Sequence, residues 1–388
     1  MKLCKKDLCS SCGTCVSICP KNAISMKKDK YGYLYPQINE ELCVNCGLCT
    51  KKCHILNDIQ KNYPKSAYAV WSSDPVDRKS STSGGAASVF YQYVCNNNGV
   101  CYGATYDENL NVVIEGYDDN RIVEFKQSKY VHSDMNDSYE KIKKNLNDKK
   151  QVVFIGLPCQ IASLKLYLGK EYDNLLLVDI ICHGTPPQEY LTSHIKNLED
   201  KYNKKANKIS FRNDNEFIFS LYEKDSDKSI VAVHKELDTY LLSFFDAMTY
   251  YEGCYSCKYA CNERVSDITI GDFWGLGLEK PFNHPYTGAI SLVLVNTDKG
   301  KNFFDKVKQN CFVEEREVAE GLKGNDQLNR PSKKHKNRTD FLNKYLDSDF
   351  DSATMSIYGE NIKKYKSIIR KNNRNRKIRS FAKKIFRR

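Results

Sequence analysis

The sequence predicts an α+β protein in which an α/β core, built on a mixed sheet, follows a cysteine-rich N-terminal module. Cysteines are dense before about residue 60, and two stretches there share one cysteine spacing. Apolar segments of strand length then alternate with helical patterns, which is typical of a sheet covered by helices. From about Pro331 the composition turns polar and basic, which favours a helical or disordered tail. We therefore expect the cysteine-rich module at 1–60, the two portions of the core at 66–150 and 151–325, and the basic tail at 331–388.

The composition indicates where in the cell the protein resides and whether its cysteines form disulfides or bind metal. The 388 residues include 17 cysteines, an odd number that argues against a fully paired disulfide framework. No apolar run reaches the about 18 residues of a membrane-spanning helix, and the N-terminus lacks the apolar stretch of a secretory signal. We therefore expect a cytoplasmic protein, because a reducing compartment keeps thiols free and clustered thiols there usually hold metal.

The N-terminal cysteines form a repeated pattern that is typical of iron–sulfur ligation. In each run, three cysteines separated by two residues can wrap one 4Fe–4S cluster, and a fourth begins a helix toward a second cluster. The fourth cysteine of such a run binds the opposite cluster, so the sequence predicts a bacterial ferredoxin-like module with two 4Fe–4S clusters. The predicted ligands are Cys9, Cys12, Cys15 and Cys53 for one cluster, and Cys19, Cys43, Cys46 and Cys49 for the other.

A zinc site or a vestigial repeat is the alternative for these runs. Zinc takes four ligands and favours paired Cys-x-x-Cys segments, so it has no use for two interlocked runs of four cysteines. One departure is His54, which stands after the last cysteine of the second run where the first run has Pro20. Cys4 is left over, and we interpret it as an ordinary thiol.

The core is expected to contain a parallel strand–helix–strand unit. Residues 151–156 form an apolar strand, a helix follows through Leu168, and residues 175–181 form a second apolar strand. Apolar strands joined through a helix indicate a buried parallel pair. Residues 208–234 look like a polar antiparallel meander. Further expected segments are strands at 67–71, 266–270 and 289–296, two strands within 100–116, and helices ending near Val94 and over 139–146.

A third cysteine group lies in the second half of the core. Cys254, Cys257 and Cys261 supply three thiolates at short range, and a cubane needs a fourth ligand. Cys159 and Cys182 each follow a buried strand, at the edge where open α/β sheets place their sites. We prefer Cys159, because a glycine and a proline frame it in a fixed turn. A third 4Fe–4S cluster, a zinc ion and a metal-free arrangement are all compatible with this pattern.

Several short motifs occur in a fixed order along the chain. They are the paired cysteine runs, 83–85 (Ser-Gly-Gly), 128–130 (Ser-Lys-Tyr), 156–160 (Gly-Leu-Pro-Cys-Gln), 182–184 (Cys-His-Gly), the third cysteine group and 271–275 (Gly-Asp-Phe-Trp-Gly). Over about residues 1–320 the chain thereby resembles the coenzyme F420 hydrogenase/dehydrogenase beta-subunit family with an N-terminal 2x(4Fe-4S) ferredoxin domain. Relatives with this domain are often encoded beside cell-surface polysaccharide enzymes. Leu157 is a departure, since threonine is common there in the family.

The resemblance implies a flavoprotein that holds one FAD beside a 4Fe–4S cluster. Such a protein exchanges electrons with a deazaflavin or another small two-electron carrier or substrate. The ferredoxin module implies ferredoxin or another redox protein as a partner. A flavin accepts two electrons as a hydride and releases them singly, so it couples hydride donors to one-electron clusters.

Candidate flavin-binding residues follow from the chemistry of the cofactor. A pyrophosphate needs backbone N–H donors at a helix start, and Ser83, Gly84 and Gly85 precede an apolar helix. The alternative is a serine–glycine turn with a helix cap. No G-x-G-x-x-G fingerprint follows a strand, so a standard Rossmann site is not supported. Lys129 is suited to pairing with a phosphate and Tyr130 to covering a ring, or else they are a surface lysine beside a half-buried tyrosine.

Two further motifs supply candidates for the reacting end of the site. Gly271, Asp272 and Trp274 stand at the exit of a strand, where an acid and an aromatic ring suit the edge of a flavin. His183 also follows a strand, and it is a candidate proton donor to a reduced flavin or to the substrate. The alternative for His183 is a structural histidine with satisfied hydrogen bonds.

The C-terminal residues are strongly basic. Ile378, Phe381 and Ile385 recur at helical spacing among the lysines and arginines of 361–388. This pattern suits an amphipathic helix in peripheral contact with the anionic inner membrane surface, and a solvated tail is the alternative. The net charge of +12 does not by itself indicate nucleic-acid binding, because no recognition motif accompanies it.

The sequence therefore favours an iron–sulfur flavoprotein oxidoreductase, linked to ferredoxin or to coenzyme F420. Two other functions are compatible with the pattern. One is an electron-transfer subunit without a substrate of its own that feeds a partner enzyme, for example in surface polysaccharide biosynthesis. The other is a cluster-bearing structural or assembly protein without redox turnover.

Overall fold

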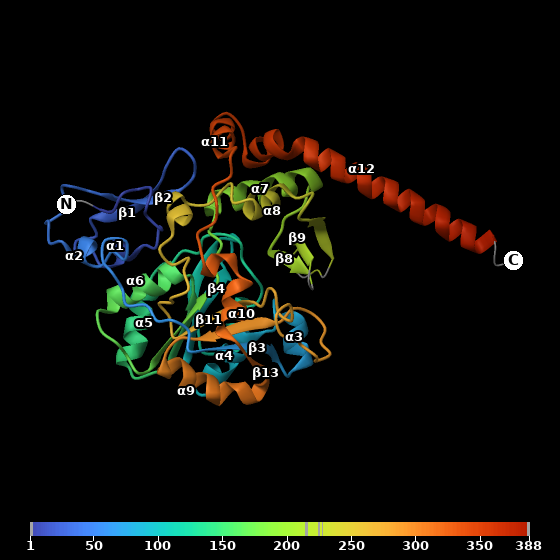
Figure 1. Ribbon diagram of the computed structural model, residues 1–388. Helices are drawn as coiled ribbons and strands as arrows, with labels where there is room; N and C mark the ends of the chain where they lie inside the picture. Colours follow the sequence, from blue (N-terminus) through green and yellow to red (C-terminus); the bar gives the residue numbers. More distant parts are fainter. Residues whose placement is uncertain (1–2, 214–215, 224–225, 227, 386–388) are drawn as a thin grey trace.

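The structure is a computed structural model that describes residues 3–213, 216–223, 226 and 228–385, with the side chains of the last helix included up to Lys371. The N-terminal module lies against one side of a large mixed sheet and its helices (Figure 1). A second layer of helices and short strands lies over one end of that sheet, and the last helix extends away from the body (Figure 1).

The N-terminal module is built from two similar halves. Each cysteine run contains a one-turn helix, α1 (Thr14–Ser17) or α2 (Leu48–Lys51), preceded by a glycine in the left-handed region (φ 77° and 79°). A residue with a side chain is strained at such a φ, so glycine permits the tight loop around each cysteine group. The antiparallel hairpin of β1 (Ile24–Lys28) and β2 (Leu34–Ile38) joins the halves. The ferredoxin-like module predicted from the spacing is confirmed.

The core sheet is mixed, with parallel strands in the centre. Its strands are β3 (Ser66–Ser72), β4 (Val100–Tyr106), β5 (Val112–Tyr117), β6 (Val152–Gly156), β7 (Leu175–Ile180), β11 (Ile268–Asp272), β12 (Ser291–Val295) and β13 (Cys311–Arg316). Within the described residues the eight strands have the order β13–β3–β12–β11–β7–β6–β4–β5. Strands β11, β7, β6 and β4 run parallel, and antiparallel strands flank them on both sides. The parallel pairing of β6 and β7 confirms the predicted strand–helix–strand unit.

Helices cover both faces of this sheet because side chains alternate along its strands. In β6, Val153 and Ile155 face one hydrophobic cluster, and Val152 and Phe154 face the other. Full burial of each such side chain contributes about 1.5–3 kcal/mol. Helices α4 (Ala86–Asn96) and α9 (Asp298–Val307) pack on the first face, and α5 (Ser138–Asn147) and α6 (Pro158–Leu168) pack on the second. Helix α10 (Val318–Lys323) packs beside β3 and β12. Helix α3 (Pro75–Ser80) follows β3.

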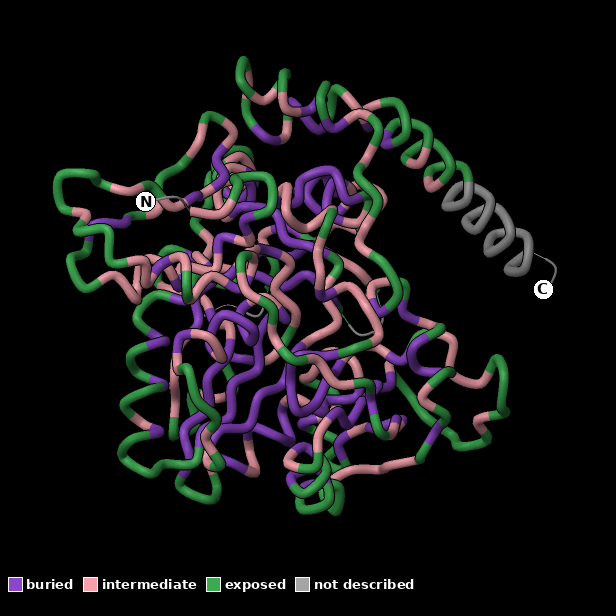
Figure 2. Tube along the Cα trace, turned by 60° about the vertical axis from the view of Figure 1, so that its left-hand side comes forward, coloured by how far each residue is buried: buried purple, intermediate pink, exposed green. Residues whose placement is uncertain are grey.

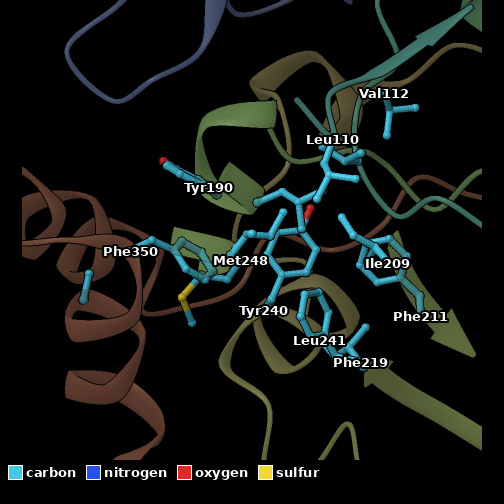
Figure 3. Close-up of a cluster of buried hydrophobic side chains, with 14 of the residues drawn as sticks. Leu110, Val112, Tyr190, Ile209, Phe211, Phe219, Tyr240, Leu241, Met248 and Phe350 are labelled. Atoms are coloured by element: carbon cyan, nitrogen blue, oxygen red, sulfur yellow. The ribbon is translucent and has the colours of Figure 1, made fainter. Parts of the chain in front are cut away.

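The second layer consists of two helices and a three-stranded sheet. Helix α7 (Gln188–Tyr202) is followed by β8 (Lys208–Asn213), β9 (Glu216–Tyr222), β10 (Ser229–His234) and α8 (Thr239–Phe245). The sheet is antiparallel with the order β10–β9–β8, which confirms the predicted meander. Figure 3 shows the hydrophobic cluster that unites this layer, including Tyr240 of α8 and Phe211 of β8.

The chain beyond Pro331 is helical, which is one of the two forms that its composition favoured. Helices α11 (Arg338–Leu346) and α12 (Phe350–Ile385) return to the second layer, where Phe341 and Phe350 are fully buried. Buried residues continue into the first turns of α12 and give way to exposed ones farther along (Figure 2). These helices are held against the body because a few apolar residues within a polar segment are buried against distant parts of the chain.

Arg338 fastens this C-terminal segment to the rest of the molecule. Its buried guanidinium donates through Nη2 to the hydroxyl of Tyr33 in the ferredoxin module at 3.1 Å and to the carbonyl of Tyr250 at 2.8 Å. Nη1 donates to the hydroxyl of Tyr255 at 3.0 Å. A single arginine therefore connects α11, the hairpin of the N-terminal module and the loop that holds the third cysteine group.

A buried histidine attaches α12 to the second layer. The ring of His194 on α7 contacts Asp351 Oδ1 through Nδ1 at 2.7 Å and Asp238 Oδ2 through Nε2 at 3.1 Å. The amide of Asn197 donates to the other oxygen of Asp351 at 2.9 Å. Burial alone would lower the pKa of His194, but the two carboxylates raise it to about 10.

Candidate functional site

The ferredoxin cysteines surround two separate cavities. Each cavity is lined by cysteines of both runs, which agrees with the exchange of fourth cysteines that the paired spacing predicts. The donor set at each cavity fits a 4Fe–4S cubane, which takes four thiolates. Cys4 lines the first cavity as an additional thiol. The first cavity is lined by Cys9, Cys12, Cys15 and Cys53 with Cys49 close by, and the second by Cys19, Cys43, Cys46 and Cys49.

The core cysteines meet at the carboxyl ends of two adjacent strands. Cys159 lies in the first turn of α6 directly after β6, and Cys182 follows β7. Burial raises the pKa of Cys159 well above its ordinary value, and the nearby thiols of Cys182, Cys257 and Cys254 raise it further. In the same way, burial and Cys257 raise the pKa of Cys254 to about 12. The structure therefore brings these four thiols together.

Cys261 lies at the edge of this group, beside Cys257, whose pKa its charge helps to raise. The sulfur of Cys261 is nevertheless engaged elsewhere, 3.3 Å from the ammonium of Lys61 and 3.2 Å from the carbonyl of Glu263. Spacing alone favoured Cys261 and Cys159 as companions of Cys254 and Cys257, whereas the fold brings Cys182 to the group. Among the described residues, no group of three or more His, Cys, Asp or Glu side chains is arranged to hold a single metal ion.

Arg264 fixes the loop that carries these cysteines. Its Nη2 donates to Asp179 Oδ2 on β7 at 3.0 Å, and both side chains are buried. Its Nη1 donates to the carbonyl of Tyr259 at 2.8 Å and to that of Cys261 at 3.2 Å. Removing one member of such a buried pair leaves an unpaired charge, so the contact holds the loop firmly on the sheet.

A cavity of about 290 Å³ opens next to the core cysteines. Gly156, Ile180 and Gly271 line it at the carboxyl ends of β6, β7 and β11, which is where open α/β sheets bind their ligands. The loop 182–184 forms part of the wall, so Cys182 belongs to the cysteine group and to the cavity.

The N-terminus of α4 faces this cavity. Gly85 caps the helix with a φ of 88°, and Ser83, Gly85, Ala86 and Ala87 line the wall. No side chain caps the helix there, so its first N–H groups are available to an anionic ligand. Gly84 does not line the cavity; its N–H donates to the hydroxyl of Ser291 at 2.9 Å, which fastens the turn to β12.

We expect Gly84→Ala to destabilise this turn strongly. A Cβ at position 84 would lie 2.1 Å from the carbonyl oxygen of Val70, which is backbone of the core sheet and cannot move aside. Overpacking of this kind costs about 1–3 kcal/mol or more, so the midpoint of thermal unfolding should fall. Gly359→Ala is the matched control, because the added Cβ meets only the end of Met355 at 3.6 Å and alanine favours the helix. Equal midpoints of thermal unfolding for Gly84→Ala and Gly359→Ala would contradict the close approach of position 84 to the Val70 carbonyl.

Lys129 and Tyr130 both line the cavity, but their present partners are within the protein. The ammonium of Lys129 donates to backbone carbonyls of 124–127, the nearest being Lys126 O at 2.9 Å. Burial lowers the pKa of Lys129 to about 7, and the negative charge of Glu124 partly opposes this shift. The ring of Tyr130 stacks on Phe244 of α8, with the centroids 4.7 Å apart.

Arg212 is a cavity residue that the sequence did not reveal. It reaches from β8 and donates through Nη1 to Asp272 Oδ2 at the end of β11, 2.9 Å away. Both side chains line the cavity, and Arg212 Nε and Asp272 Oδ1 are buried without a hydrogen-bond partner. Unpaired buried atoms of this kind are costly, so they indicate a place where a polar ligand would complete the site. A lone arginine in a polar strand, far from its partner, gives no sequence signal.

The remaining predicted residues lie at the more open part of the cavity. His183 and Trp274 both line it, and both are exposed to solvent. The carbonyl of His183 accepts a hydrogen bond from the hydroxyl of Ser332 in the C-terminal segment. Their exposure leaves these two side chains accessible to a molecule that enters the cavity from solution.

Two regions of the chain match families of known proteins. Residues 149–321, which contain the core cysteines and part of the cavity wall, match the family described as the C terminus of the coenzyme F420 hydrogenase/dehydrogenase beta subunit. Over these residues the core is similar to this beta-subunit family. Residues 8–55 match the 4Fe-4S dicluster domain. The chain thus has the domains of an iron–sulfur electron-transfer subunit of the F420 hydrogenase/dehydrogenase type, as the motif order predicted.

Individual proteins are similar to all or part of the chain. The F subunit of the F420H2 dehydrogenase of Methanosarcina mazei is 20% identical over 333 residues, which cover 80% of this chain and 85% of the relative. The ferredoxin-type protein NapF of Haemophilus influenzae is 36% identical over 55 residues, covering 13% of this chain and 31% of the relative. A chain in a xenon-derivatised F420-reducing NiFe hydrogenase complex from Methanosarcina barkeri has a TM-score of 0.45 and 16% identity, covering 77% of this chain and 92% of that one.

Membrane contact is predicted for the C-terminal residues 361–388. None of the described helices is long and apolar enough to cross a membrane. The apolar residues predicted to face a lipid surface, Ile378, Phe381 and Ile385, lie outside the side chains that the structure describes. Peripheral membrane contact through 361–388 stays a prediction.

Proposed function

We propose that the protein is an iron–sulfur flavoprotein oxidoreductase that passes electrons between its ferredoxin module and a flavin in the core cavity. The observation that carries the proposal is that Cys182 belongs both to the core cysteine group and to the cavity wall. A ligand in the cavity would therefore lie against the cysteine group. When bound, a 4Fe–4S cluster exchanges single electrons. FAD takes up two electrons and can exchange them singly with such a cluster.

For the third cluster we propose Cys159, Cys182, Cys254 and Cys257 as ligands. Their mutual effects on pKa support this set, because each thiol lies close enough to its neighbours to disfavour their ionisation. The hydrogen bonds of Cys261 to backbone carbonyls support leaving that thiol outside the proposed set.

For the flavin, the residues of the cavity fit the chemistry of FAD. The free N–H groups at the start of α4 suit a pyrophosphate, and the turn of Ser83, Gly84 and Gly85 presents them. The unpaired atoms of Arg212 and Asp272 suit a polar ring edge, which both donates and accepts hydrogen bonds. Tyr130, Trp274 and His183 would border the ring, and His183 is the candidate proton donor because it lines the cavity and reaches solvent.

We expect Arg212→Gln to weaken flavin binding without loss of iron. A hydrogen bond to a charged group contributes about 1.5–3 kcal/mol, so the Kd for FAD should rise about tenfold to about a hundredfold. Flavin retained after gel filtration and iron per chain are the two measurements. Arg121→Gln is the matched control, because Arg121 forms an exposed pair with Asp119 and does not line the cavity. Loss of flavin in both variants, or in neither, would contradict the assignment.

Under this proposal, a redox protein binds at the ferredoxin module and a small electron carrier binds at the cavity. We expect reduced ferredoxin, mixed anaerobically with the purified protein, to bleach the flavin absorbance within one catalytic cycle. A protein donor is chosen because it is too large to enter the cavity. A chain that retains its flavin but is not reduced in this way would contradict the proposed electron path.

An electron-transfer subunit that feeds a partner enzyme is the second candidate. One observation favours it, because the relative with the longest match among those named above is itself called a subunit. Under that hypothesis a reduced carrier such as coenzyme F420 would not turn over with the isolated chain. Turnover of ferredoxin with a small carrier by the isolated chain would exclude it. A role in surface polysaccharide biosynthesis is an expectation from resemblance alone.

A further inference from the structure

The two ferredoxin cysteine groups lie at different depths in the molecule. Cys46 of the second group, the outer group, is exposed, and exposed residues Leu42 and Val44 stand beside it in the same loop. The first group, the inner group, lies against the core, because the hydroxyl of Tyr139 on α5 donates to the carbonyl of Cys12 at 2.8 Å. The same hydroxyl is 2.6 Å from Ser163 Oγ on α6, the helix that also carries Cys159, so the inner group lies beside the part of the core that holds this cysteine.

His54 lies at the junction between the inner group and the core, on the side of the inner group. It follows Cys53 directly, occupies the place of a proline in the other run, and is only 1% exposed. Its Nε2 is 2.7 Å from the hydroxyl of Ser10, beside Cys9. Its Nδ1 is 2.8 Å from the hydroxyl of Tyr259 in the core. The histidine side chain therefore spans the gap between module and core with hydrogen bonds at both ends.

Tyr259 stands on the core side of the same junction. It lies two residues after Cys257 and is 3% exposed. Burial raises its pKa far above the ordinary value, and the charges of Cys159, Cys257, Cys12 and Cys53 raise it further. Its hydroxyl contacts the ring of His54, which directly follows Cys53, so the phenol ring lies where the core group meets the inner group.

We infer that the hydrogen-bonded pair of His54 and Tyr259 is the bridge through which electrons pass between the inner ferredoxin cluster and the core cluster. The inference rests on the proposed function, because it requires clusters at both groups. One electron leaves the reduced cluster and one enters the oxidised cluster. No bond forms or breaks, and the proton of the pair stays between the same two atoms. Transfer between fixed centres falls steeply across an empty gap, and bonded and hydrogen-bonded atoms reduce that loss.

The bridge also explains why the sequence departs from proline at position 54. Proline has no side-chain donor or acceptor and could not contact Tyr259. Tyr139 is the competing route, because the charges of Cys12 and Cys159 also raise its pKa. Its hydroxyl contacts the backbone of Cys12 and the side chains of Thr14 and Ser163, so it touches the inner group but no residue of the 254–261 loop through a hydrogen bond.

The test measures the rate at which reduced ferredoxin bleaches the flavin in a stopped-flow instrument. Tyr259→Phe keeps the ring and removes the hydroxyl, and His54→Ala removes the other half of the bridge. We expect both variants to keep the iron and flavin content, and Tyr259→Phe to keep the cluster potentials as well, while flavin reduction becomes several-fold slower in both. Tyr139→Phe is the matched control and should react at the unmodified rate.

Three results would overturn the inference in distinguishable ways. An unmodified rate in Tyr259→Phe with all iron present would exclude the bridge. Slowing by Tyr139→Phe alone would place the route through α5 instead. Loss of iron or a changed cluster potential in Tyr259→Phe would mean that the pair serves the structure of the site and not the path. By contrast, a lack of core iron or flavin in the unmodified protein would count against the proposed function itself.

Discussion

Replacing Cys257 with serine is expected to lower the iron content from about twelve to about eight atoms per chain, because one of three 4Fe–4S clusters loses a ligand. Cys159→Ser and Cys182→Ser should have the same effect, since both thiols join Cys257 at the carboxyl ends of β6 and β7. Serine is close in size to cysteine, so the fold should persist while the cluster is lost. Iron and acid-labile sulfide, measured on protein purified without oxygen, give the result.

Cys261→Ser is the decisive control for this ligand set. The variant should keep about twelve iron atoms, because the sulfur of Cys261 makes its contacts with Lys61 and with backbone carbonyls. A loss of about four iron atoms from Cys261→Ser, with full iron in Cys182→Ser, would restore the set that spacing alone favoured.

Replacing His194 with alanine is expected to destabilise the protein by about 3–5 kcal/mol at neutral pH, because it leaves two buried carboxylates without their cation. Asp238 and Asp351 hold the ring from α8 and α12, so the attachment of the C-terminal helix should loosen as well. Chemical denaturation measures the free energy of unfolding, and limited proteolysis beyond residue 331 measures the loosening. His284→Ala is the matched control, since the half-exposed pair of His284 and Glu314 should contribute at most about 1 kcal/mol.

The pH dependence of this effect has a definite sign. The carboxylates raise the pKa of His194 to about 10 in the folded protein, whereas an unfolded histidine titrates near about 6.5. Folding therefore favours proton binding at His194, and its stabilising effect is complete below about pH 6.5 and is lost as the pH rises through about 10. The difference in unfolding free energy between the variant and the unmodified protein should shrink over that interval. A difference that grows with pH would contradict a protonated His194.

The sequence predicted those parts of the fold that depend on local patterns. Apolar runs and turn residues located β3, β6, β7 and β12, and the cysteine spacing located the ferredoxin module. The strand β13 was missed, because Cys311–Arg316 alternates polar and apolar residues weakly and pairs with β3 from far along the chain.

The parts that could not be predicted depend on contacts between distant residues. Arg338 secures α11 through hydrogen bonds to Tyr33 and Tyr250, which no local pattern in a polar segment reveals. Arg212 and Asp272 meet across the cavity from two different sheets. The proposed choice of cluster ligands among Cys159, Cys182 and Cys261 likewise required the fold. Spacing along the chain favours residues that are close in sequence, whereas the sheet brings together residues that follow adjacent strands.

The central claim is that three iron–sulfur clusters and one flavin share this chain. The most direct test is to purify the unmodified protein anaerobically and to measure iron, acid-labile sulfide, zinc and flavin per chain. The account predicts about twelve iron, about twelve sulfide, one FAD and no stoichiometric zinc. About eight iron without flavin, or zinc in place of the missing iron, would contradict it and would limit redox chemistry to the ferredoxin module.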